Sequence, residues 1–133
     1  ENRSFSQSDF VRVCSNLKEL FQVNEKLLQD MIVCVDPTPN SNPNNMRIGF
    51  AFSSRASAIL RTYTRYAADN PNALEAVAKL KTDNKTFALL CREFSKLKEA
   101  HHLDVESFLV TPVQRICKYP MLIRELLLLT PPS

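Results

Sequence analysis

The clearest chemical arrangement in the chain lies on a segment near its end whose spacing predicts a helix. Counted at 100° per residue from Gln114, Lys118 falls at about 40° and Glu125 at about 20°, so an amide, an ammonium and a carboxylate share one side. Met121 lies on the same line, and Cys117 lies at its edge. These groups suit binding to a polar partner surface, although on an arbitrary helix such a line is most often a solvated face.

Chemistry of the bond-breaking kind has little support in the sequence. Glu99-Ala100-His101-His102 contains one Glu-x-x-His pair, whereas di-iron helical bundles use that pair twice with two further glutamates. The two histidines are more simply the end of a helix. No Ser/His/Asp or Cys/His set stands out. We therefore expect no metal, no cofactor and no enzyme in the covalent sense; a metal-dependent helical-bundle enzyme is a third alternative that only Glu99 and His102 support.

The composition is that of one compact helical domain. The 133 residues are 44% hydrophobic and 23% charged, and they include a single glycine, which argues against a sheet-rich fold and excludes Gly-rich phosphate loops. The net charge of +3 is mild, so no nucleic-acid partner is expected. Four widely spaced cysteines fit a reducing compartment. With no membrane-spanning stretch and no signal peptide, the sequence predicts a cytoplasmic protein.

The helix that carries the polar line has a predicted start and predicted structural residues. Pro112 suits the first helical position, and Thr111 and Gln114 have the spacing of a capping box. Arg115 projects away from the line, and we expect it to pair with a carboxylate inside the bundle. Tyr119 is expected in the core with a bonded hydroxyl.

The remaining periodic segments predict further helices. They run from Ser6 or Ser8 to about Ile32, from Ile48 to Ala68, from Asn72 to Leu80, from Asp83 to Leu97 and from Asp104 to Leu109. The sides expected to face the core include Phe10, Val13, Leu20, Phe21, Leu27, Leu28 and Ile32, then Ile48, Phe52, Ile59, Leu60, Tyr63 and Tyr66, and later Phe87, Leu90, Cys91 and Phe94. Asn24 interrupts the first of these sides, and bonding to a neighbouring helix is a commoner explanation than a partly wet position. Residues 36–46, rich in proline and asparagine, predict a flexible loop.

Several segments together carry a family resemblance. Ser107-Phe108-Leu109-Val110 leads into Thr-Pro-Val-Gln-Arg at 111–115, then Lys118-Tyr119 and a run of leucines that ends at Thr130-Pro131. Similar matches occur at 15–21, at Ile48-Gly49 with Phe52, and at Tyr63-x-x-Tyr66. The chain resembles the Dbl-homology domains, which are guanine nucleotide exchange factors for Rho-family GTPases, over essentially its whole length.

The resemblance implies a fold and a set of binding residues. The fold is all-α, an elongated antiparallel helical bundle, and the partner is a Rho-family small GTPase. The implied GTPase-binding residues are Gln114, Lys118, Met121, Cys117 and Glu125. Lys118 would contact the acidic switch II of the GTPase, and Gln114 would either bond to switch backbone groups or cap the helix. Arg115, Tyr119 and Pro112 would be structural.

The family module has parts that this sequence does not show. A helix with a glutamate that engages switch I is not seen before Ser8, and no long helix with a switch-II contact, usually followed by a pleckstrin-homology domain, is seen after Pro132. We therefore expect residues 1–133 to form a single partial Dbl-homology domain, incomplete at both ends. Recruitment to the plasma membrane would depend on a missing neighbouring domain.

The expected function is stabilisation of a nucleotide-free Rho-family GTPase through contacts to its switch regions, without covalent chemistry. This would release GDP and admit GTP by shifting a population of states. The main alternative is a helical scaffold or binding module that lacks exchange activity.

Overall fold

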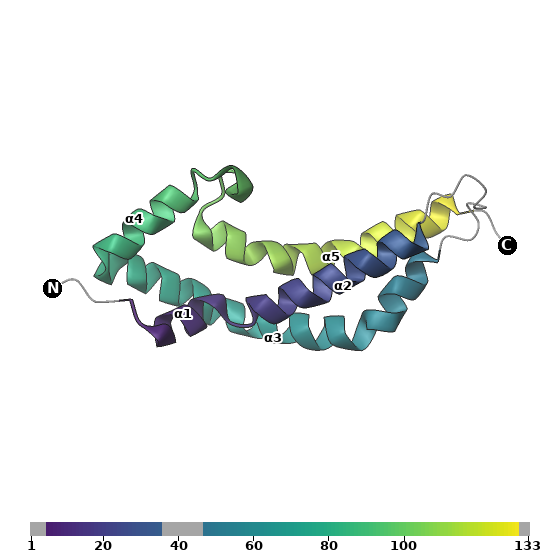
Figure 1. Cartoon of the computed structure of the whole chain (residues 1–133), viewed down its shortest axis with the longest axis horizontal. Coiled ribbons are helices and arrows are strands. Elements are labelled where there is room, and N and C mark those ends of the chain that lie inside the picture. Colours follow the sequence, from purple (N-terminus) through teal and green to yellow (C-terminus); the bar gives the residue numbers. More distant parts are fainter. Residues whose placement is uncertain (1–4, 36–46, 131–133) are drawn as a thin grey trace. The chain divides into compact units, whose positions relative to one another are not determined.

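The computed structural model describes residues 5–35 and 47–130, and its regular elements are all helical in these ranges. The α-helices are α1 (Gln7–Cys14), α2 (Leu17–Cys34), α3 (Ile48–Asp83), α4 (Lys85–Phe94) and α5 (Val105–Leu129), with a short 3₁₀ helix, η2 (Lys98–Ala100), before α5 (Figure 1). The expected all-α class is confirmed. The loop expected at 36–46 lies outside the described residues.

The chain divides into two compact units. Unit 1 comprises Glu1–Ser15 and Arg65–Gln114, and unit 2 comprises Asn16–Thr64 and Arg115–Ser133. Helices α3 and α5 therefore contribute to both. Each unit has its own buried residues: Val13, Tyr66, Ala73, Val77, Leu80, Cys91 and Leu109 in unit 1, and Leu20, Leu27, Ala51, Ile59 and Tyr63 in unit 2. The single partial domain over 1–133 stays a prediction.

The first expected helix is two helices in the structure, so its predicted continuity is wrong. Helix α1 begins at a capping box, in which the Asp9 N–H donates to the Ser6 hydroxyl at 3.2 Å and the Ser6 N–H donates to the Asp9 carboxylate at 3.1 Å. It ends at Ser15, whose φ is 44° and whose hydroxyl donates to Asp69 at 2.8 Å. The next residue, Asn16, is buried and donates to the Thr62 carbonyl. Hydrogen bonds to residues so distant in the sequence cannot be predicted from hydrophobic periodicity.

Helix α3 runs through Pro71, where the sequence predicts a break after Asn70. In unit 1 the buried side of α3 passes through Tyr66, Asn70, Ala73, Val77 and Leu80, a spacing of four and three that never slips. Pro71 itself is exposed, so its ring removes a backbone hydrogen bond on the solvent side while the buried side stays in phase. The break expected between Ala68 and Asn72 is therefore absent.

Helix α4 is shorter than the predicted 83–97. Asn84 caps it by accepting a hydrogen bond from the Phe87 N–H at 2.8 Å. Cys91 is buried and Phe94 is half-buried as expected, but Leu90 is 63% exposed. The buried stripe follows the i, i+4, i+7 positions of Phe87, Cys91 and Phe94, and Leu90 lies beside it.

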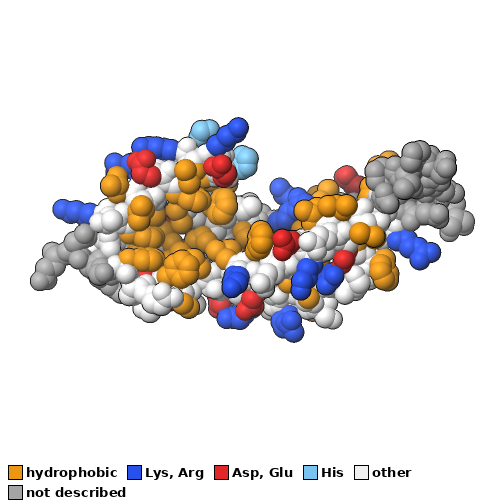
Figure 2. Space-filling view, viewed as in Figure 1, with side chains coloured by type: hydrophobic (Ala, Val, Ile, Leu, Met, Phe, Trp, Pro, Cys, Tyr) orange, Lys and Arg blue, Asp and Glu red, His pale blue; other side chains and the backbone are white. Residues whose placement is uncertain are grey.

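Other residues expected in the core are also exposed. They are Phe10, Phe21, Leu28, Ile32 and Leu60. On the visible face of unit 1, hydrophobic side chains gather beside α4 (Figure 2). The sequence thus predicts more buried apolar residues than the two units bury. Several helices therefore keep exposed apolar side chains.

Helix α5 contains the residues that the sequence predicts as its start. It begins at Val105, after Asp104 accepts a hydrogen bond from the Ser107 N–H at 2.8 Å. Thr111 donates its hydroxyl to the Ser107 carbonyl in the preceding turn, so the predicted capping box and the opening role of Pro112 are wrong. Pro112 has no N–H for the carbonyl four residues earlier.

Tertiary donors support α5 beside this proline. The carbonyl of Leu109 accepts hydrogen bonds from the Tyr66 hydroxyl at 2.7 Å and from Nδ2 of Asn70 at 2.9 Å. All three residues are buried, with Leu109 only 5% exposed. A second link joins Lys81 to the Glu106 carboxylate at 2.6 Å. These contacts therefore tie α5 to α3 at the residue next to Phe108, whose carbonyl Pro112 leaves without its helical donor.

Candidate interaction surface on helix α5

The predicted binding residues are exposed side chains of α5. They are Gln114 and a group of four, Cys117, Lys118, Met121 and Glu125, which we name the polar stripe. Gln114 is the last residue of unit 1, and the other four belong to unit 2, where positions 118, 121 and 125 repeat at helical spacing. All five are exposed, Met121 by 66%. None of their side chains makes a hydrogen bond or ion pair within residues 5–35 and 47–130.

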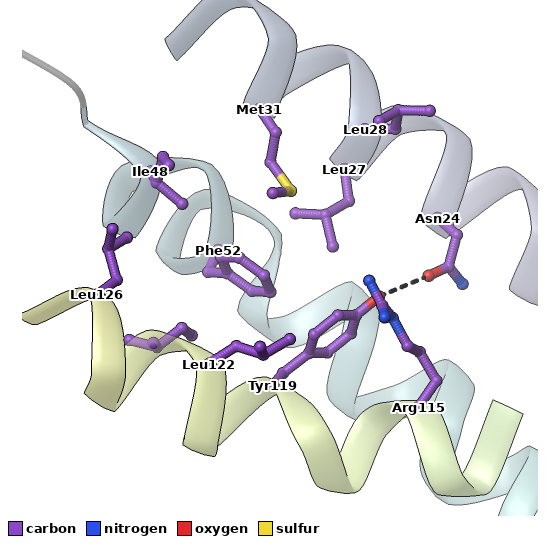
Figure 3. A pocket seen from close by; sticks show the side chains of 11 residues that line it. Asn24, Leu27, Leu28, Met31, Ile48, Phe52, Arg115, Tyr119, Leu122 and Leu126 are labelled. Atoms are coloured by element: carbon purple, nitrogen blue, oxygen red, sulfur yellow. Dashed lines mark hydrogen bonds between the residues drawn. The ribbon is translucent and has the colours of Figure 1, made fainter. Parts of the chain in front are cut away.

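The opposite side of α5 in unit 2 meets a half-buried polar side chain. Asn24 of α2 accepts a hydrogen bond from the Tyr63 hydroxyl of α3 at 2.9 Å and another from the Tyr119 hydroxyl of α5 at 3.3 Å (Figure 3). Its Nδ2 donates to the Leu20 carbonyl at 2.7 Å. We call Asn24, Tyr63 and Tyr119 the amide hub. The expected helix-to-helix bond of Asn24 and the bonded hydroxyl of Tyr119 are both confirmed.

The Tyr63 hydroxyl of the hub remains a hydrogen-bond donor over the physiological pH range. Burial raises the pKa of Tyr63 to about 12, and its bond to Asn24 only partly opposes this. Tyr119 is half-buried and also meets the ring of Phe52 edge-on, with centroids 5.2 Å apart and planes at 68°. The hub therefore combines directional hydrogen bonds with an oriented aromatic contact.

Arg115 does not have the carboxylate partner that the sequence predicts. Its guanidinium lies over the ring of Tyr119, 5.1 Å from the centroid, as a cation–π contact. Among the side chains that the structure describes, no acid pairs with it. Arg115 lines a groove together with the uncharged α2 residues Asn24, Leu27 and Leu28. Its cation therefore contacts an aromatic ring one turn further along α5.

An apolar groove of about 500 Å³ opens beside the hub in unit 2. Figure 3 shows Leu27 and Met31 from α2 pointing into the space between α2 and the α5 residue Leu122. Its lining residues are Asn24, Leu27, Leu28, Met31, Ile48, Phe52, Arg115, Tyr119, Leu122, Ile123 and Leu126. The sequence predicts that many of these residues are apolar core positions. It does not predict that an open groove lies between them.

A surface ion pair also joins α2 to α3 in unit 2. Arg55 donates from Nε to Asp30 Oδ2 at 2.6 Å and from Nη2 to Oδ1 at 3.2 Å. The hydrogen bond from Arg55 lowers the pKa of the Asp30 carboxyl below its ordinary value. Both side chains are about one-third exposed, so the pair fixes geometry more than it adds stability.

The Glu99–His102 pair gains no further ligand in the structure. Glu99 lies in η2, and His101 and His102 follow in a left-handed turn with φ of 50° and 63°, which fits the predicted helix end. Within the described ranges, no three His, Cys, Asp or Glu side chains gather where they could hold a metal ion.

Comparison with known proteins gives the family. A family model for the RhoGEF domain matches residues 1–133. This chain belongs to the RhoGEF family. The RhoGEF chain is 32% identical over 131 residues to the Myosin-M heavy chain of Dictyostelium discoideum, a match that covers 98% of the chain and 7% of that protein. The Dbl-homology resemblance of the sequence is thereby confirmed.

Two further relatives carry exchange-factor names. The chain is 31% identical over 119 residues to the human phosphatidylinositol 3,4,5-trisphosphate-dependent Rac exchanger 2 protein, with 88% of the chain and 7% of that protein covered. It is 29% identical over 127 residues to Rac guanine nucleotide exchange factor B of Dictyostelium discoideum, with 87% and 11% covered. The chain thus spans about a tenth of the length of these relatives. No solved structure matched it.

None of the described helices is both long and apolar enough to cross a membrane.

Proposed function

We propose that this RhoGEF chain takes part in guanine nucleotide exchange on a Rho-family GTPase, and that the polar stripe of α5 contacts the switch regions. The family and the names of two relatives support the activity. The stripe is supported by its exposure and by side chains that have no partner among the described residues. The chain acts here as a regulator that performs no covalent chemistry.

Lys118 is the central residue of this proposal. Its ammonium offers three donors on a flexible stem, which suits an acidic loop that changes shape during exchange. Glu125 adds an acceptor, and Met121 adds an adaptable apolar contact. The contribution of Gln114, which belongs to unit 1, stays a prediction of its own. Catalysis consists of tighter binding to the nucleotide-free GTPase than to its GDP-bound form, which shifts the population towards the free form.

The observation that carries the proposal is the separation of two sides on α5 in unit 2. Tyr119, next to Lys118 in the chain, donates its hydroxyl to Asn24 in the amide hub. Lys118 is exposed and unpaired among the described side chains. A residue that serves the fold and a residue left available for a partner are therefore adjacent in the sequence.

The test is release of fluorescent GDP from Rho-family GTPases by the full-length protein and its Lys118→Ala variant. We expect at least about a tenfold slower release, which corresponds to about 1.4 kcal/mol of lost stabilisation. Lys79→Ala makes the same change of charge at an exposed site of α3 in unit 1 and serves as the control. Equal release by all three proteins would refute the role of the stripe. Retained binding of the nucleotide-free GTPase without any release would favour the scaffold alternative.

A further inference from the structure

In unit 2 the amide hub joins three helices, α2, α3 and α5, at a single side chain. The oxygen of Asn24 receives both hydroxyls, and its nitrogen is used by the Leu20 carbonyl, so the orientation of the amide is fixed. No buried side-chain nitrogen or oxygen in the described residues lacks a hydrogen bond. A satisfied polar group of this kind specifies geometry more strongly than it adds stability.

Apolar packing around α5 restrains the rotation of this helix only weakly. Leu122 is 49% exposed and Leu126 is 41% exposed, and the groove of about 500 Å³ lies between them and the leucines of α2. Side chains that border open space do not interdigitate, so they resist rotation of the helix weakly. In this part of α5 the Tyr119 hydroxyl and the Phe52 edge contact are the directional restraints.

Rotation matters because Lys118 immediately precedes Tyr119. With side-chain tips about 6 Å from the helix axis, a turn of about 20° moves them by about 2 Å. Misplacement of a functional group by about 1 Å can already cost a large factor in rate.

We propose that Asn24 is a positioning residue for exchange: by holding Tyr119 it sets the rotation of α5 within unit 2 and thereby the direction of Lys118. The inference rests on the proposed function of the polar stripe. Asn24 itself contacts no GTPase and acts only through Tyr119.

The two tyrosines of the hub offer a matched pair of variants. Tyr119→Phe and Tyr63→Phe each delete one hydroxyl that donates to the same oxygen, but only Tyr119 belongs to α5. We expect Tyr119→Phe to slow GDP release by the full-length protein by about fivefold, the scale of one lost hydrogen bond, and Tyr63→Phe to leave release within about twofold of the parent. Release is measured well below the melting temperature of every variant, so that all remain folded.

Substitution of Asn24 gives a rescue test. Asn24→Leu removes the acceptor. Asn24→Asp keeps an oxygen for both hydroxyls, but it loses the donor to the Leu20 carbonyl and introduces a negative charge. Exchange should fall in the leucine variant and return largely in the aspartate variant. If both tyrosine variants slow release in proportion to their loss of melting temperature, Asn24 is merely structural and the inference fails.

The inference and the proposed function fail in different ways. If Lys118→Ala leaves release unchanged, the polar stripe is not the binding surface and both fall. If Lys118→Ala slows release while Asn24→Leu and Tyr119→Phe do not, only the positioning role of Asn24 is refuted.

Discussion

The shared carbonyl of Leu109 leads to a sharp prediction about the stability of unit 1. It accepts from the Tyr66 hydroxyl and from Nδ2 of Asn70, at 2.7 and 2.9 Å, in a buried place next to Pro112. One carbonyl oxygen has two lone pairs, and within α5 the Val113 N–H is the donor that helix geometry assigns to one of them, so either side-chain donor alone still fills the other. Tyr66→Phe or Asn70→Leu alone should therefore cost about 1 kcal/mol each.

The double variant should cost more than the sum of its parts. With both donors gone, a buried carbonyl loses both of its side-chain partners, which adds about 1–2 kcal/mol of desolvation to the two single losses. For a chain of this size each 1 kcal/mol lowers the melting temperature by about 3–5 °C.

Urea unfolding of the parent, the two single variants and the double variant measures this coupling. An interaction free energy near zero would refute the reasoning, because it would mean that the two bonds act independently. The Thr82→Ala variant is a suitable control, since Thr82 is exposed and its hydroxyl bonds only to the Ala78 carbonyl within α3.

Two further predictions follow. Burial raises the pKa of both Tyr63 and Tyr66 to about 12 from 10.0, so both favour the folded state while they are protonated; their contribution is complete below pH 10 and is lost as the pH rises towards 12. Melting temperatures across this range should fall steeply, and less so in Tyr66→Phe; an unchanged slope in that variant would contradict the assignment. The 133-residue chain alone should self-associate, because Leu126, Leu127, Leu128 and Leu129 are all exposed on α5. Sedimentation should show a mass that rises with concentration, and a stable monomer at every concentration would count against this.

The sequence predicts the helical class and most of the helical segments, because these depend on local periodicity. It also predicts the hydrogen-bonded Asn24, since an amide in an apolar stripe needs a partner. It does not predict the break at Ser15, because the bonds to Asp69 and Thr62 link residues far apart in the chain. Pro71 misleads for a related reason: whether a proline ends a helix depends on which side of the helix it occupies.

The candidate site, too, could be predicted only in part from the sequence. The exposure of Lys118 and Met121 follows from the helical wheel, and the structure agrees. The partner of Arg115 does not follow, because a ring one turn away competes with any distant carboxylate and only the structure shows which is near. The groove could not be predicted from the pattern, which reports which side chains are apolar and not whether they meet. The role of the stripe in binding stays a prediction.

The unequal exposure of the four free thiols gives the polar stripe a practical use. Cys91 is buried and Cys14 is half-buried, and burial raises the pKa of both thiols, so each carries little of the reactive thiolate. Cys34 is half-buried, whereas Cys117 is exposed and lies on the stripe beside Lys118. A mild alkylating dye should therefore label this position first and place a fluorescent reporter at the proposed docking surface of the natural sequence. Arrival of a partner would then be read as a change in emission, without any engineered cysteine.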